Sequence, residues 1–145
     1  MTLNCVVVDD SAIQRLSIVK LVENHPSLNL IAEYSSALET KNGLNTNQVD
    51  LIFLDIEMPY GNGFDLLERI KNINFEVVFI TAYSNYAIKA INLSASSYIL
   101  KPIDIDELVN AVNKIKENNW AIKSVNIFKK STFVVVSKLK AFARK

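Results

Sequence analysis

The sequence has one cysteine, few glycines and no apolar stretch long enough to cross a membrane. A single cysteine excludes an internal disulfide, and Cys5 lies inside an apolar run, which favours a buried structural thiol. A membrane span would need about 18 to 20 apolar residues. The first residues, MTLNCVVVDDS, also lack the basic region of a signal peptide. We therefore expect a cytoplasmic protein with no membrane partner.

Glycine-rich catalytic and nucleotide-binding motifs are missing as well. The chain has no Gly-x-Ser-x-Gly elbow, no Walker loop and no dinucleotide-binding glycine fingerprint. These absences make an α/β hydrolytic enzyme a poor interpretation. His25 has no second metal-type ligand beside it and is interpreted as a surface residue. Half of the residues are apolar and 21% are charged, which is the composition of a globular domain.

Carboxylates are absent from the C-terminal part of the chain. Residues 118–145 carry a charge of +7, whereas residues 1–117 carry −6. Such asymmetry is typical of an appendage with a partner of its own. We therefore expect a domain over residues 1–118 and, after Asn118-Asn119, a basic tail over 119–145. That tail is interpreted as a linker or as the start of a truncated output domain, with short strands at 124–128 and 132–136.

Short apolar runs of strand type alternate with amphipathic segments along the first 117 residues. The runs are nearly free of charge, as in strands that are buried on both faces of a parallel sheet. The pattern predicts an α/β fold: a doubly wound, five-stranded parallel sheet of strand order 2-1-3-4-5 with a short basic C-terminal tail. The expected strands are 3–8, 28–34, 51–54, 77–80 and 97–100, and the expected helices are 11–23, 36–44, 64–71, 84–93 and 105–117.

Polar residues stand at the ends of four of these strands: Asp9-Asp10, Asp55, Thr81 and Lys101. Taken singly, each is explained more simply as a helix cap, a turn residue or a surface lysine. The carboxyl ends of parallel strands share one edge of the sheet, so we expect these side chains to converge. Carboxylates suit a hard cation such as Mg²⁺, and a hydroxyl with an ammonium suits an anion. The set therefore predicts metal-assisted phosphoryl chemistry.

The motifs VVVDDS, LDIEMPYGNGFDLL, ITAY and SYILKPI together resemble the receiver domain of two-component response regulators, a flavodoxin-like fold, over residues 3–118. The resemblance implies a signalling receiver, not an enzyme in the usual sense, in which a sensor histidine kinase donates a phosphoryl group to Asp55. The same resemblance implies that Asp10, Asp55 and the Glu57 backbone carbonyl bind Mg²⁺ directly, and that Asp9 acts mainly through water. It also implies that Lys101 and Thr81 contact the phosphoryl group and that Tyr98 is the aromatic switch residue. The peptide bond before Pro102 is expected to be cis.

Further features of the resemblance concern regulation and output. Glu57 and Tyr83, two residues after Asp55 and Thr81, are expected to flank the path of the water that removes the phosphoryl group. The segment TAYSNYAIKAINLSASSYILKPI is similar to receivers that precede a LytTR-type DNA-binding domain. Such a regulator would bind DNA only with a full output domain, and the receiver could form a homodimer through the face made by the fourth helix, fifth strand and fifth helix.

Two other functions compete with phosphorylation-dependent signalling. One is direct, salt-dependent nucleic-acid binding through the basic tail, which would disappear if residues 119–145 were removed. The other is an interaction module that works without phosphorylation. The second alternative is disfavoured because every acidic, hydroxyl and lysine position of the motif set is retained.

Overall fold

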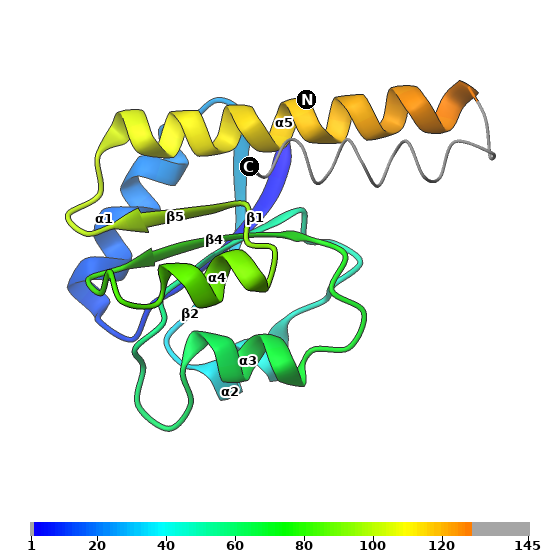
Figure 1. Ribbon diagram of the computed structural model, residues 1–145. Helices are drawn as coiled ribbons and strands as arrows, with labels where there is room; N and C mark the ends of the chain where they lie inside the picture. The colour runs from blue at the N-terminus through cyan, green and yellow to red at the C-terminus, as the bar shows by residue number, and fades with distance from the viewer. Residues whose placement is uncertain (1, 129–145) are drawn as a thin grey trace.

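The structure is a computed structural model and describes residues 2–128. Five strands alternate with five helices along this part of the chain (Figure 1). Their bounds are β1 Leu3–Val8, α1 Ala12–Glu23, β2 Leu28–Tyr34, α2 Ala37–Gly43, β3 Leu51–Leu54, α3 Gly63–Arg69, β4 Glu76–Thr81, α4 Ala87–Asn92, β5 Ser97–Leu100 and α5 Ile105–Phe128. All neighbouring strands are parallel, in the order β2-β1-β3-β4-β5. The predicted fold class and strand order are thus confirmed.

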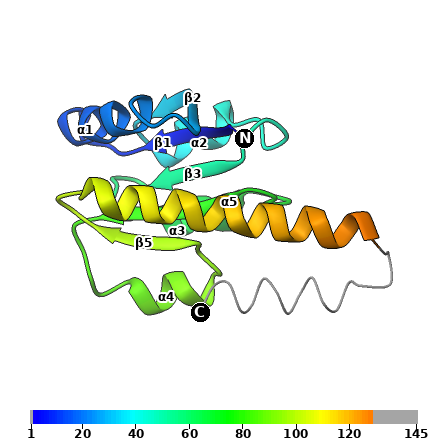
Figure 2. The same ribbon diagram turned by 90° about the horizontal axis from the view of Figure 1, so that it is seen from above.

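Helices cover both faces of the sheet, with α1 and α5 on one face and α2, α3 and α4 on the other (Figures 1 and 2). Successive residues of a strand point to opposite faces, so each central strand supplies side chains to both cores. Phe53 packs in the core beneath α1 and α5, whereas Ile52 and Leu54 pack in the core beneath α2 and α3. All four residues of β3 are buried, which explains its uninterrupted apolar sequence.

Side-chain caps fix where three of the helices begin. The Ser11 hydroxyl accepts a hydrogen bond from the backbone N–H of Gln14 at 3.3 Å, and Ser36 caps α2 in the same way. Asn62 and Asp65 form a reciprocal capping box at α3, in which each side chain accepts from the other residue's backbone N–H. Because Ser11 directly follows Asp9-Asp10, the first cap also holds the chain that carries these aspartates.

The C-terminal helix differs from the prediction. It does not end near Glu117 but continues through Asn118-Asn119 to Phe128, so the strand predicted at 124–128 is wrong. No proline or glycine occurs between 118 and 128, and so nothing in that stretch forces a helix to stop. Figure 1 shows α5 running on beyond the amino ends of the strands. The domain boundary at 118/119 stays a prediction, and the strand predicted at 132–136 lies outside the described residues.

Helix α4 is shorter than expected. It begins at Ala87 instead of Ser84, and its N-cap residue, Tyr86, makes no side-chain capping hydrogen bond. Residues 82–86 therefore form a non-helical connection after Thr81. Within residues 2–128, no helix combines the length and apolarity that crossing a membrane would require.

Candidate functional site

The predicted site residues lie at the carboxyl edge of the sheet, as the strand order requires. Asp9 follows β1, Asp55 follows β3, Thr81 ends β4 and Lys101 follows β5. Backbone hydrogen bonds tie neighbouring strand ends together: the Asp55 N–H donates to Val8 O at 3.0 Å, and the Lys101 N–H donates to Thr81 O at 2.8 Å. The sheet itself therefore positions the four side chains relative to one another.

Three carboxylates form the acidic part of the site. Asp9, Asp10 and Asp55 each place one oxygen within 4.8 Å of the other two. Asp9 and Asp55 are buried, whereas Asp10 is exposed. Buried carboxylates so close together repel one another unless cations are present. Oxygen ligands on a partly open edge are the donor set that suits Mg²⁺, which retains several of its own waters. The residues therefore fit the predicted cation.

Lys101 supplies a positive charge inside this cluster. Its Nζ donates to Asp9 Oδ2 at 2.7 Å and to Asp55 Oδ2 at 3.0 Å. A third hydrogen bond goes to the side-chain oxygen of Gln14, on the first turn of α1. An ammonium has three donors, so the described contacts occupy all of them. The two aspartates keep further partners, because Asp9 Oδ1 accepts from Ser11 N–H at 2.9 Å and Asp55 Oδ1 from Ile56 N–H at 2.7 Å.

Burial and ion pairing act in opposite directions on the pKa values of Asp55 and Lys101, and a different one of them dominates at each residue. Burial raises the pKa of the Asp55 carboxyl above its usual range, although the hydrogen bond from Lys101 opposes this shift. Burial acts to lower the pKa of Lys101, but the hydrogen bonds to Asp9 and Asp55 outweigh it and the pKa is raised. The raised pKa of Asp55 therefore reflects a carboxylate with little access to solvent, and the raised pKa of Lys101 reflects an ammonium paired with two carboxylates.

Thr81 and Tyr98 are linked through the connection between β4 and α4. Thr81 is completely buried, and its Oγ1 accepts a hydrogen bond from the Tyr83 N–H at 3.4 Å. The Tyr98 hydroxyl donates to the Tyr83 backbone carbonyl. Thr81 and Tyr98 therefore both hold Tyr83, one through its N–H and the other through its carbonyl. The peptide bond before Pro102 is cis, as the resemblance implied.

Glycine is required where α3 begins beside the site. A Cβ on Gly63 would lie 2.5 Å from the Asp55 carbonyl oxygen and 3.3 Å from Ile56 Cα. The Gly63 N–H donates to Ile56 O at 2.8 Å, which closes the loop that follows Asp55. Glu57 follows Ile56 in this loop, so the close approach of Gly63 also restricts the backbone that leads to Glu57.

Two residues that contact the site, Gln14 and Tyr86, were not predicted from the sequence. Gln14, which binds Lys101, lies on the first turn of α1 with no strand end to mark it. Tyr86, whose hydroxyl donates to Glu57 Oε1, lies 29 residues further along the chain. The contact of Gln14 could have been predicted, because Gln14 is a polar residue on the first helical turn after Asp9-Asp10. Nothing in the sequence indicated the contact of Tyr86.

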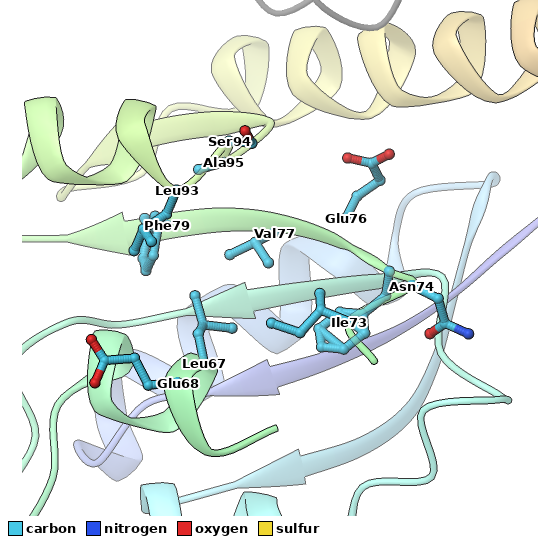
Figure 3. Close-up of a pocket in the computed structure, with 11 residues that line it drawn as sticks. Leu67, Glu68, Ile73, Asn74, Glu76, Val77, Phe79, Leu93, Ser94 and Ala95 are labelled. Atoms are coloured by element: carbon cyan, nitrogen blue, oxygen red, sulfur yellow. The ribbon is translucent and has the colours of Figure 1, made fainter. Parts of the chain in front are cut away.

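A cavity of about 680 Å³ lies away from the carboxylates, at the beginning of β4 (Figure 3). Its walls include Leu67 and Glu68 of α3, Val77 of β4 and Leu93 after α4 (Figure 3). None of Asp9, Asp55 or Lys101 lines it. The chemistry predicted for the strand ends is therefore placed at an open edge of the sheet and not in this cavity.

Comparisons with known proteins show which family the chain belongs to. The model of the response regulator receiver domain matches residues 5–113, which is well over half of the chain. The chain belongs to the response regulator receiver family. The receiver domain is 34% identical over 123 residues to the sensory transduction protein LytT of Enterococcus faecalis, covering 83% of this chain and 51% of that protein. It is 36% identical over 112 residues to LytR of Staphylococcus haemolyticus, covering 76% and 44%.

Solved structures give the same result. The receiver domain matches the REC domain of AraT, a response regulator from Geobacillus stearothermophilus, with a TM-score of 0.74 and 31% identity, covering 85% of this chain and 99% of that one. It also matches the response regulatory domain of mrkE from Klebsiella pneumoniae, with a TM-score of 0.71 and 29% identity, covering 79% and 95%. The chain spans about half the length of the curated relatives that it matches.

Proposed function

We propose that this receiver domain is a phosphorylation switch in which the Asp55 carboxylate accepts a phosphoryl group from a sensor histidine kinase. The observation that carries the proposal is the convergence of Asp9, Asp10, Asp55 and Lys101 at one sheet edge. In the transfer, a bond forms between an Asp55 oxygen and phosphorus while the phosphorus–nitrogen bond of the kinase phosphohistidine breaks. The site is a phosphoryl acceptor and self-dephosphorylating unit, not an enzyme acting on a separate substrate.

Mg²⁺ is the proposed cofactor. Asp10 and Asp55 would hold it directly, together with the backbone carbonyl of Glu57, and Asp9 would act mainly through water. When bound, the cation neutralises negative charge on the phosphoryl oxygens. The Ser11 N–H holds one oxygen of Asp9, and Glu57 belongs to the loop that Gly63 closes.

Lys101 and Thr81 are the proposed phosphoryl contacts. The ammonium of Lys101 lies 3.0 Å from Asp55 Oδ2, so it is already beside the atom to which the phosphoryl group becomes attached. A fixed positive charge at that point stabilises developing negative charge without reorganisation. Thr81 ends the neighbouring strand, and its hydroxyl would turn from the Tyr83 N–H toward a phosphoryl oxygen.

The proposed output of the switch is a change on the face formed by α4, β5 and α5. Movement of Thr81 releases the Tyr83 N–H, and Tyr98 holds the carbonyl of that same residue. An inward rotation of Tyr98 would then reshape this face as a shift between two packings. Exposed apolar side chains on α4, Ile88 and Ile91, are available there for a homodimer contact.

The proposed biological setting is a LytTR-type transcriptional regulator in the cytoplasm, of which this chain is the regulatory part. The similarity to LytT and LytR supports the proposal, as does the coverage of about half of each relative. Binding to DNA would need a full output domain. The basic segment 119–145, taken alone, stays an untested alternative for nucleic-acid binding, because its side chains lie outside the part of the structure that is described.

The test is incubation with acetyl phosphate and Mg²⁺ followed by intact-mass analysis. The native chain should gain one phosphoryl group that is labile to base, and the gain should be lost in Asp55→Asn and on chelation of Mg²⁺. Asp106→Asn, which changes an exposed carboxylate on α5, is the matched control and should label like the native chain. Persistent labelling of Asp55→Asn would overturn the assignment of the acceptor.

A further inference from the structure

The side chain of Glu57 is held by a residue from a different part of the site. Its Oε1 accepts a hydrogen bond from the hydroxyl of Tyr86, the N-cap residue of α4. The acidic cluster of Asp9, Asp10 and Asp55 does not include Glu57. The loop after Asp55 thus carries a fourth carboxylate that is not part of the cluster, and a phenol from the β4–α4 connection binds it.

Packing fixes the ring of Tyr86 in this position. The ring lies edge-on to Phe64, with centroids 5.8 Å apart, and edge-on to Tyr83, with centroids 6.3 Å apart. Phe64 is buried at the start of α3 and also packs against Phe79 of β4 at 5.1 Å. The hydroxyl of Tyr86 therefore extends from a ring that is anchored on the core, whereas Glu57 is an exposed residue of a loop. The tyrosine is the fixed partner of this pair.

We propose that Tyr86 is a positioning residue for phosphoryl transfer, which keeps the carboxylate of Glu57 away from the incoming phosphoryl group. This inference rests on the proposed function of Asp55. A phosphodonor is an anion, and the site already contains three carboxylates beside the ammonium of Lys101. A further mobile carboxylate two residues after Asp55 would repel the donor, because unscreened like charges interact over several ångströms. The hydrogen bond from Tyr86 removes that carboxylate from the approach.

Removal of the Tyr86 hydroxyl should have the effect of losing one hydrogen bond to a charged group that is in contact with solvent. Because water competes for both partners, loss of the bond frees Glu57 for only part of the time, and we expect a change of about two- to fivefold. Tyr86→Phe keeps the ring and its contacts with Phe64 and Tyr83, but lacks the hydroxyl. This variant should need about two- to fivefold more acetyl phosphate for half-maximal phosphorylation, with little change in the rate at saturation.

A double-mutant cycle separates positioning from packing. Glu57→Gln removes the charge that Tyr86 is proposed to hold away, so Tyr86→Phe should have no effect on half-saturation in that background. If Tyr86 acted only through packing, its substitution would have the same effect whether or not position 57 carries a charge. Equal effects in the two backgrounds would overturn the inference. Tyr60→Phe, in a fully exposed tyrosine of the same loop, is the matched control and should behave like the native chain.

A measurement without phosphodonor tests the contact itself. The hydrogen bond to Glu57 raises the pKa of the Tyr86 phenol above its usual value. NMR titration of tyrosine-labelled protein should show that pKa falling toward its ordinary value in Glu57→Gln, and an unchanged pKa would contradict the contact. Native chain that is not phosphorylated at all would refute the proposed function, whereas normal phosphorylation with an additive cycle would refute only the role of Tyr86.

Discussion

Replacement of Lys101 by methionine removes the ammonium that the structure places between two buried carboxylates. Asp9 is completely buried, the side chain of Asp55 is 9% exposed, and that of Lys101 is 13% exposed. Breaking a buried ion pair by removal of one partner costs about 3–5 kcal/mol. Each carboxylate keeps one backbone N–H donor, from Ser11 or Ile56, so the lower end of this range applies.

We therefore expect Lys101→Met to lower the free energy of unfolding by about 3 kcal/mol in metal-free buffer. With a denaturant dependence of about 1.5 kcal/mol per molar urea, the unfolding midpoint should fall by about 2 M. The raised pKa of Lys101 gives the same sign, because a basic group that gains protons on folding stabilises the folded state below its unfolded pKa. The assay is urea unfolding followed by circular dichroism, with a chelator present throughout.

Two further variants make the result interpretable. Lys71→Met, at an exposed position, is the matched control and should change the midpoint little. In the double variant with Asp9→Asn, the buried charge is removed together with its partner, so part of the lost stability should return. A loss below about 0.5 kcal/mol for Lys101→Met would refute the reasoning, because it would mean that the ammonium does not compensate the carboxylates.

Three other predictions follow from single residues. Asp55→Asn should be more stable than the native chain near neutral pH. Burial raises the pKa of the Asp55 carboxyl above 3.8, so the folded state binds this proton more tightly than the unfolded state does. The native chain therefore loses stability as the pH rises and Asp55 becomes charged, whereas asparagine stays neutral. The difference between their urea midpoints should shrink in acid. Burial raises the pKa of the Cys5 thiol from 9.0 to about 12, so native protein should be alkylated about a thousandfold more slowly than unfolded protein at the same pH. Gly63→Ala should lose about 1–3 kcal/mol of stability, since its Cβ would meet the Asp55 carbonyl oxygen at 2.5 Å.

The results that would contradict these predictions are distinct. A native chain as stable as Asp55→Asn at every pH would show that the burial of Asp55 carries no energetic cost. Equal alkylation rates of folded and unfolded protein would place Cys5 at the surface. An alanine at position 63 without effect on the urea midpoint would mean that the loop after Asp55 can move away from α3 freely.

The sheet and the placement of the strand-end residues could be predicted from the sequence. The reason is physical: a strand buried on both faces, such as Leu51–Leu54, must be apolar throughout, and parallel strands bring their carboxyl ends to a common edge. Asp55 and Lys101 are 46 residues apart in the chain, and the sheet order places them at the same edge with one strand between them, a gap that the long lysine side chain spans. Here local pattern and topology determine the outcome together.

Other features depend on information that local pattern does not contain. The predicted end of α5 was wrong. Apolar and polar residues alternate at 124–127 as in a strand, but the residues after Glu117 up to Phe128 include no proline or glycine that would stop a helix. The contacts of Gln14 with Lys101 and of Tyr86 with Glu57 join side chains from separate loops and helices. Such contacts follow from rotamers and loop paths, which are settled only when the whole domain is packed.

The most direct test of the phosphorylation account is the chemical identification of the modified residue. Treatment of the acetyl phosphate-labelled chain with borohydride reduces an aspartyl phosphate to homoserine, which peptide mass spectrometry locates in the sequence. We predict homoserine at position 55, dependent on Mg²⁺ and absent without phosphodonor. Homoserine in place of Asp9, Asp10 or any other aspartate, with Asp55 intact, would contradict the assignment of Asp55 as the phosphoryl acceptor.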